Sequence, residues 1–120
     1  MIFTKAFKSF LYACNGLKNV WREERNFRIE IVAALVVAFC VAYFHFSLTE
    51  GLFCLLAITT VLAAEIVNTA LEDMCDKIQP ELDPAIGKIK DLMAAFVLVS
   101  VTGAFGIGIA VFYHHFLYNF

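Results

Sequence analysis

Apolar positions run almost without interruption through three long stretches of this chain, and polar positions collect between them. The apolar stretches cover 29–46, 51–71 and 92–116. Each is long enough, or nearly so, for a helix rising about 1.5 Å per residue to cross a hydrocarbon layer about 30 Å thick. The pattern therefore predicts three transmembrane helices.

The first 28 residues follow a different pattern. Apolar side chains recur there at spacings of three and four, at Phe3, Phe7, Phe10, Leu11, Cys14, Leu17 and Trp21. Lysine, arginine and asparagine occupy the rest of the helical wheel. This arrangement is typical of an amphipathic helix at a membrane surface. We expect residues 1–28 to form such a surface helix, and simple membrane anchoring is the alternative role for it.

Composition places the chain among membrane proteins. Its 120 residues are 62% hydrophobic with a mean hydropathy of +0.79, whereas an ordinary soluble domain is about 45–50% apolar. The four cysteines are scattered, which indicates buried small side chains and argues against a disulfide framework or a zinc site. We expect one all-α integral membrane domain over 1–120. Three helices enclose little surface, so neighbouring chains of an oligomer should cover their polar faces.

Basic residues predict the orientation of the chain. All nine lysines and arginines lie before the first span or between the second and the third. By the positive-inside rule both segments are cytoplasmic, and the C-terminus lies on the opposite side. The segment 76–91 contains both prolines, Pro80 and Pro84, and is predicted to be a cytoplasmic loop.

A carboxylate lies deep within the second span. If the helix enters the membrane near Gly51, Glu65 lies about 20 Å inside, and Glu72 follows about 10 Å later near the far edge. The residues that share its helical face follow at i+3, i+7 and i+11, and they are Asn68, Glu72 and Asp76. An ionisable group at such depth costs on the order of several kcal/mol and indicates a functional site.

These residue types are suited to phosphoryl transfer at a membrane boundary. Glu65 can act as a general base towards a substrate that lies in the membrane, and Asn68 can orient it. Oxygen ligands of the kind that Mg²⁺ prefers beside phosphate are available near the cytoplasmic edge, from Glu23, Glu24, Glu30, Glu72 and Asp76. Lys90 can neutralise phosphate charge.

Other functions fit the same residues. The sequence has no Walker-type, kinase-type or Rossmann-type glycine loop. A proton-coupled transporter subunit also uses an intramembrane glutamate, so the residues alone place it level with a lipid phosphotransferase. In a third interpretation, Glu65 and Asn68 only bridge helices of a non-catalytic membrane assembly protein.

Two motifs resemble a known family. The run E-I-V-N-T-A-L-E-D-M-C-D at 65–76 and the run K-D-L-M-A-A at 90–95 resemble the signature of the prokaryotic diacylglycerol kinase and undecaprenol kinase family. The similarity extends to 16–18, to 23–28 and to the order of a surface helix followed by three spans. It favours a lipid kinase over a transporter.

The resemblance implies a multi-pass homotrimer in the bacterial inner membrane, with composite active sites facing the cytoplasm. Such an enzyme transfers the γ-phosphate of ATP, with Mg²⁺, to the hydroxyl of a membrane lipid alcohol. The wording of 23–27 and 68–70 resembles the undecaprenol branch more than the diacylglycerol branch. Undecaprenol is therefore the favoured substrate.

The resemblance also implies residue roles. Glu65 matches the catalytic base and Asn68 its neighbour, while Glu24 and Glu72 match the metal-binding glutamates. The implied nucleotide-binding set is Lys5, Tyr12, Glu24, Glu72, Asp76, Glu81, Lys90 and Asp91. The expected substrate-binding set is Glu65, Trp21, Phe27 and Glu30. Lys5 stands where the family commonly has arginine, whose planar fork a lysine lacks.

Overall fold

The chain folds into long helices with short connections. The computed structural model describes residues 2–78 and 83–118. The helices are α1 (Ile2–Glu23), α2 (Arg25–Tyr43), α3 (Leu48–Ile78) and α4 (Pro84–Tyr113), and a π-helical turn, η1 (His114–Tyr118), continues α4. The described residues contain no strand, so the expected all-α class is confirmed.

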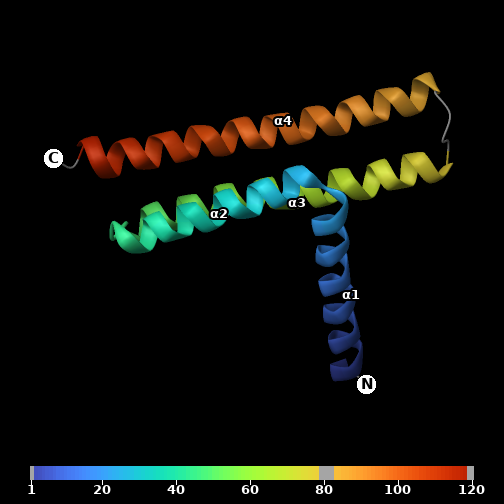
Figure 1. Ribbon diagram of the computed structural model, residues 1–120, viewed down its shortest axis with the longest axis horizontal. Coiled ribbons are helices and arrows are strands. Elements are labelled where there is room, and N and C mark those ends of the chain that lie inside the picture. The colour runs from blue at the N-terminus through green and yellow to red at the C-terminus, as the bar shows by residue number, and fades with distance from the viewer. Residues whose placement is uncertain (1, 79–82, 119–120) are drawn as a thin grey trace.

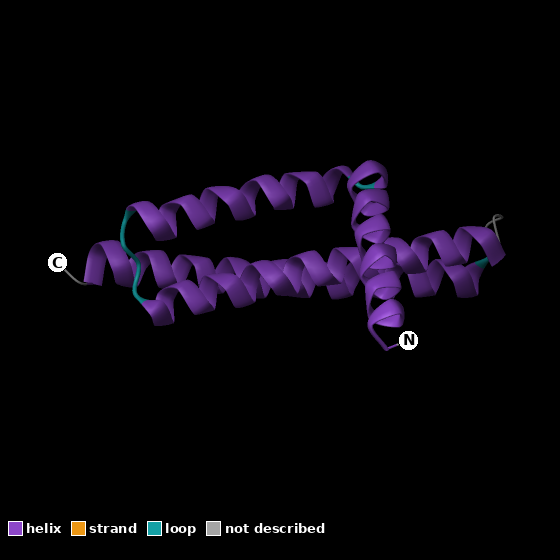
Figure 2. Ribbon diagram, turned by 90° about the horizontal axis from the view of Figure 1, so that it is seen from below, coloured by secondary structure: helices purple, strands orange, loops and turns teal. Residues whose placement is uncertain are grey.

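Three of these helices are long and apolar enough to cross a membrane. They are Arg25–Tyr43, Leu48–Ile78 and Pro84–Tyr118, the last including η1. They lie alongside one another, and α1 stands across their long axis, as Figure 1 shows. The view in Figure 2, turned by a quarter, shows the same relation. The predicted membrane-embedded chain with three spanning helices agrees with this arrangement.

Helix α3 is the centre of the fold. It packs against α4 along much of its length and against α2 on another side. Eight of its residues are buried, whereas α1, α2 and α4 each bury one, namely Val20, Phe27 and Val111. Most of the surface of α2 and α4 is therefore not covered by the chain itself.

The corner between α1 and α2 lies at Glu24. This residue has an extended backbone, with φ −114° and ψ 111°. The Arg28 guanidinium donates to the carbonyl oxygens of Trp21 at 2.6 Å and Arg22 at 3.1 Å, which otherwise end α1 without partners. The first helix thus ends at Glu23, and residues 25–28, which we expected in a surface helix, belong to α2. We call the part of the bundle from this corner to the α3–α4 connection the corner end.

The connection between α3 and α4 is shorter than the loop predicted over 76–91. Helix α3 continues through Ile78, and α4 begins at Pro84. Proline is favoured in a first helical turn, where its missing N–H needs no partner. The Asp83 carboxylate caps the helix by accepting a hydrogen bond from the Ala85 N–H at 2.8 Å. Most of the predicted loop is therefore helical.

The cysteines differ in exposure. Cys54 and Cys75 are buried and Cys40 is half-buried, as expected of small apolar side chains. Cys14 is exposed, which corrects the expectation for this residue. It lies on α1, which projects from the rest of the described chain (Figure 1).

Candidate active site

Glu65 and Asn68 are among the polar residues of α3 that are buried near the corner end. Glu65 is 2% exposed and Asn68 is 8% exposed. Among residues 2–78 and 83–118, buried Glu65 Oε2 and Asn68 Oδ1 find no hydrogen-bond partner, and neither does Glu30 Oε2 on α2. An unsatisfied buried polar atom costs about 1–3 kcal/mol. These three atoms therefore mark a site that needs a partner from outside the chain.

The neighbouring polar groups on α3 are partly satisfied. Asn68 Nδ2 donates to Glu72 Oε1 at 3.3 Å, which links the buried residues to the half-buried Glu72 one turn later. The Thr69 hydroxyl donates to the carbonyl oxygen of Glu65 at 2.8 Å. Since that hydrogen bond lies within the helix, the buried Thr69 hydroxyl already has a hydrogen-bond partner.

The corner brings further carboxyl groups to α3. Burial raises the pKa of Glu24, and the negative charges of Glu72 and Asp73 raise it further. A hydrogen bond to the Asp73 carboxyl, together with its charge, raises the pKa of Glu23. Two glutamates from the corner thus meet two acidic residues of α3, and a cation at this point would relieve their repulsion.

The donor set at the corner fits Mg²⁺. Within residues 2–78 and 83–118, no group of three or more His, Cys, Asp or Glu side chains is placed to hold a metal ion. Mg²⁺ is commonly held by only one or two carboxylates together with phosphate oxygens and water. The predicted pair, Glu24 and Glu72, supplies that number of carboxylates.

An ion pair joins α3 to the start of α4. Lys90 Nζ lies 2.5 Å from Asp76 Oδ1, and both side chains are well exposed. Asp91 is also exposed next to Lys90. The structure therefore brings Lys90 and Asp76 of the predicted nucleotide set together at the corner end.

The other predicted nucleotide residues lie apart from this group. Lys5 and Tyr12 are exposed on α1, and Tyr12 is about 18 Å along the helix axis from Glu24. Since α1 projects from the bundle (Figure 1), these two side chains do not reach Glu65 of the same chain. Glu81 lies outside the described residues.

The predicted substrate residues divide in a similar way. Trp21 is 44% exposed near the corner, and one carboxylate oxygen of Glu30 is buried. Phe27 is only 3% exposed and packs inside the corner. Its expected role in substrate binding stays a prediction.

An apolar groove runs between α2, α3 and α4. It has a volume of about 480 Å³ and extends from Glu30 on α2 to Phe112 near the end of α4. Among the described residues that line it, Glu30 alone is charged. The groove therefore offers an apolar path that begins beside the buried carboxylates.

Sequence reasoning missed Asp73 and Arg28. Asp73 lies next to Glu72 in the chain, but its meeting with Glu23 depends on the corner. The contact of the Arg28 side chain with the end of α1 likewise depends on the turn at Glu24. Neither contact has a signal in helical periodicity.

Comparison with known proteins identifies relatives across most of the chain. The sequence model of the family described as prokaryotic diacylglycerol kinase matches residues 11–112. The undecaprenol kinase of Bacillus subtilis (strain 168) is 33% identical over 106 residues, which are 88% of this chain and 86% of the relative. The diacylglycerol kinase of Escherichia coli (strain K12) is 29% identical over 99 residues, which are 82% of this chain and 81% of the relative.

A third relative matches the same share of this chain as the Escherichia coli enzyme does. The diacylglycerol kinase of Helicobacter pylori (strain ATCC 700392 / 26695) is 28% identical over 99 residues, which are 82% of this chain and 77% of the relative. The family match includes α2, α3 and most of α4, and with them Glu24, Glu65 and Lys90. The chain belongs to the prokaryotic diacylglycerol kinase family and is a lipid kinase, an enzyme that transfers a phosphoryl group.

Proposed function

We propose that the chain transfers the γ-phosphoryl group of ATP to the hydroxyl of a membrane lipid alcohol, with Glu65 as the general base. The observation that carries this proposal is the unpartnered Glu65 Oε2, buried deep in α3. A lipid hydroxyl that enters from the membrane would donate its hydrogen bond to this oxygen. Glu65 would then accept the proton as the hydroxyl oxygen attacks phosphorus.

Asn68 fixes the geometry beside the base. Its Nδ2 is held by Glu72, which leaves Oδ1 as a free acceptor directed into the site. The groove that begins at Glu30 supplies an apolar surface for the lipid tail. The substrate is thus held at its hydroxyl by polar atoms and along its tail by apolar contact.

Glu24 and Glu72 are the residues that would hold Mg²⁺ at the corner end. The ion, when bound, neutralises charge on the phosphates of ATP. Lys90, oriented by Asp76, adds a positive charge beside the same carboxylates, with Asp91 next to it. In the proposed topology this end faces the cytoplasm of a bacterial inner membrane, where ATP is available, and the C-terminus lies on the opposite side.

We also propose that the active unit is a homotrimer with sites shared between chains. Two observations support an oligomer. Lys5 and Tyr12 project away from the chain's own Glu65, and α2 and α4 each bury a single residue. A neighbouring chain would cover these helices and receive the α1 side chains at its own site.

Undecaprenol is the proposed substrate in preference to diacylglycerol. The relative named undecaprenol kinase is 33% identical to this chain, and the Escherichia coli relative named diacylglycerol kinase is 29% identical. Both lipids would be bound mainly through apolar contact, so phosphorylation of the two lipids must be measured side by side.

Transfer of labelled phosphate from Mg-ATP tests the proposal. Purified protein in mixed micelles is offered undecaprenol and diacylglycerol in parallel. Label on undecaprenol supports the full proposal, and label on diacylglycerol alone changes the substrate. Label on neither lipid, from folded and oligomeric protein, would overturn the proposed role of Glu65 in phosphoryl transfer.

A further inference from the structure

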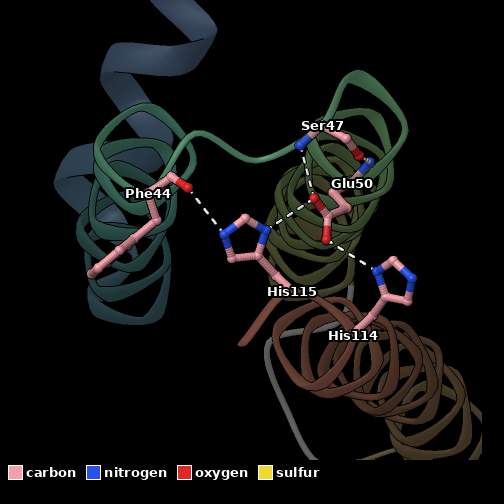
Figure 3. Close-up of polar contacts among 5 residues, drawn as sticks. All are labelled: Phe44, Ser47, Glu50, His114 and His115. Atoms are coloured by element: carbon pink, nitrogen blue, oxygen red, sulfur yellow. Dashed lines mark hydrogen bonds and ion pairs between the residues drawn. The ribbon is translucent and has the colours of Figure 1, made fainter. Parts of the chain in front are cut away.

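A carboxylate and two histidines form a cluster at the end of the bundle opposite the corner (Figure 3). Glu50, in the first turn of α3, is 7% exposed. Its Oε1 lies 3.1 Å from His115 Nδ1, and its Oε2 lies 3.2 Å from His114 Nδ1. The second ring nitrogen of His115, Nε2, lies 3.0 Å from the carbonyl oxygen of Phe44. The end of α2, the start of α3 and η1 therefore meet at these side chains.

Local capping explains only part of this arrangement. The Ser47 N–H donates to Glu50 Oε1 at 2.8 Å, and the Glu50 N–H donates to Ser47 Oγ at 3.2 Å. This reciprocal pair is a capping box and stabilises the start of α3 without help from a histidine. The histidines come from η1, the π-helical turn that follows α4. In an α-helix two consecutive side chains point about 100° apart, whereas here both rings reach one carboxylate.

The contacts of His115 determine how many protons the cluster holds. A carbonyl oxygen such as that of Phe44 only accepts hydrogen bonds, and an ionised Glu50 only accepts as well. A neutral imidazole donates through one nitrogen, so it cannot satisfy both contacts of His115. Either His115 is an imidazolium, or the Glu50 carboxyl is protonated and donates to Nδ1. Both forms hold one proton more than a neutral imidazole beside a carboxylate.

The contact of His114 does not require an additional proton. Only its Nδ1 contacts Glu50, so one neutral tautomer satisfies the contact. Its side chain is 55% exposed, whereas that of His115 is 18% exposed. His114 is therefore the more exposed of the two histidines that contact the buried carboxylate.

Few other groups at this end can titrate. At this end of the elements that pack here, the remaining titratable residues are Cys40 and Tyr43 on α2, His45 in the connection, Cys54 on α3, and Tyr113 and Tyr118 on α4 and η1. Every lysine and arginine lies at or before residue 28 or between 77 and 90. The histidines are thus the only cations available to Glu50 from the described residues at this end.

The cluster also fixes one end of the apolar groove. The Phe46 ring stacks on the His115 ring with centroids 4.2 Å apart, and it packs against Phe112 at 5.1 Å. Phe112 lines the groove. Residues of both α2 and α4 line that groove, and His115 joins the two helices at this end through its contacts with Phe44 and Phe46.

We propose that Glu50, His114 and His115 form a protonation-dependent clasp that holds the end of α4 to the α2–α3 hairpin. With the additional proton bound, His115 bridges Glu50 and the Phe44 carbonyl. Without that proton, one ring nitrogen of His115 faces an acceptor with no hydrogen to donate. The end of α4 is then released. In the proposed topology this end lies outside the cytoplasm, so external acidity would tighten the clasp.

Thermal unfolding of the full-length chain in micelles tests the clasp. Wild type is compared with His115→Gln between about pH 5.5 and about pH 8, the range in which imidazoles titrate. We expect wild type to have a Tm about 4 °C higher at the acidic end, and the difference to close at the alkaline end. Carboxyl groups at the corner titrate in both proteins, so the difference between them isolates the clasp.

His45→Asn is the matched control. His45 is the remaining histidine of the chain. It lies in the connection between α2 and α3 with φ 54°, and it is not one of the groups bound to Glu50. Asparagine tolerates that left-handed backbone, so this variant should follow wild type at every pH. A Tm difference for His115→Gln that stays constant with pH, or a loss of pH dependence in His45→Asn, would overturn the proposal.

A second measurement does not depend on the variant folding. Nuclear magnetic resonance of the wild-type chain at about pH 5.5 reports protonation of the His115 ring nitrogens and of the Glu50 carboxyl. The clasp requires both ring nitrogens, or one of them and the carboxyl, to be protonated. An ionised Glu50 beside a singly protonated His115 would refute it. Neither result depends on whether the chain phosphorylates undecaprenol.

Discussion

Two buried polar residues four positions apart on α3 are satisfied very differently. The Thr69 hydroxyl donates to a backbone carbonyl of its own helix, so its burial is explained by local structure. Glu65 Oε2 has no partner among the described residues, and its burial is not explained in this way. At the residue scale this difference separates a structural group from a candidate catalytic one.

Glu65→Gln should abolish phosphoryl transfer while the fold survives. The amide keeps the shape of the side chain but cannot accept the proton of the lipid hydroxyl, so we expect the rate to fall by about 100-fold or more. Thr69→Val is the control. It removes the polar group of a neighbouring buried residue while keeping the shape of its side chain, and it should alter the rate only slightly. Equal rates for wild type and Glu65→Gln in the labelled-phosphate assay would exclude Glu65 as the base.

Glu24 should make the stability of the chain depend on both pH and Mg²⁺. Burial and the charges of Glu72 and Asp73 raise its pKa, so the folded chain binds this proton more tightly than the unfolded chain does. The stabilisation is complete below about pH 4, where an unfolded glutamate is protonated, and it is lost as pH rises through the raised pKa. At neutral pH without divalent ions, Glu24→Gln should therefore raise the Tm by about 2 °C.

Mg²⁺ should then act on wild type more than on the variant. Added Mg²⁺ relieves the repulsion in wild type and should raise its Tm, whereas Glu24→Gln has lost one proposed ligand and should respond weakly. Asp91→Asn makes the same change of charge at an exposed position and should respond like wild type. The same Mg²⁺ response in Glu24→Gln and wild type would remove Glu24 from the metal site.

At the scale of elements, the start of α4 depends on its cap. The Asp83 side chain accepts from the Ala85 N–H, and the Gly87 N–H donates to the Asp83 carbonyl at 2.9 Å. Asp83→Ala removes the first of these hydrogen bonds and should cost about 1 kcal/mol at the helix end. We expect amide hydrogen exchange over 85–87 to become about fivefold faster, and Asp83→Asn to preserve the slower exchange. Unchanged exchange in Asp83→Ala would show that packing alone holds this turn.

The elements were predictable from the sequence to different extents. Apolar runs are a local property, so the three spanning helices follow directly from them. The start of the third at Pro84 was missed because Lys88 and Lys90 interrupt the apolar run, although a proline after an aspartate is a common beginning of a helix. The capping box Ser47-Leu-Thr-Glu50 is equally visible in the sequence, between the first two predicted spans.

The candidate site shows where such prediction stops. Depth and spacing along one helix were sufficient to predict Glu65 and its neighbour Asn68. The pairing of Glu23 with Asp73 and the burial of Phe27 depend on how α1 turns into α2, which no repeat in the sequence records. The contact between Glu50 and His115 joins segments 65 residues apart and was invisible for the same reason.

At the scale of the whole molecule, a single chain supplies only part of the proposed active site. Lys5 and Tyr12 lie on the projecting α1, while Glu65 and Asn68 lie within α3 (Figure 1). If sites form between chains, α1 of one chain completes the site built on α3 of another. Inactive chains with defects in different halves should then restore one another.

Mixing two inactive variants within one oligomer tests this arrangement. One carries Glu65→Gln, and the other carries Lys5→Met with Tyr12→Ala. In a cyclic oligomer with sites shared between neighbours, random mixing at equal amounts leaves about a quarter of the sites with both halves intact, so about a quarter of wild-type activity should return. Mixing Glu65→Gln with Asn68→Leu is the control, because both defects lie in the same half and no site regains both residues. Since the two mixtures differ only in the location of the second defect, recovery in the first alone requires α1 and α3 of one site to come from different chains, whereas no recovery in either places them in one chain.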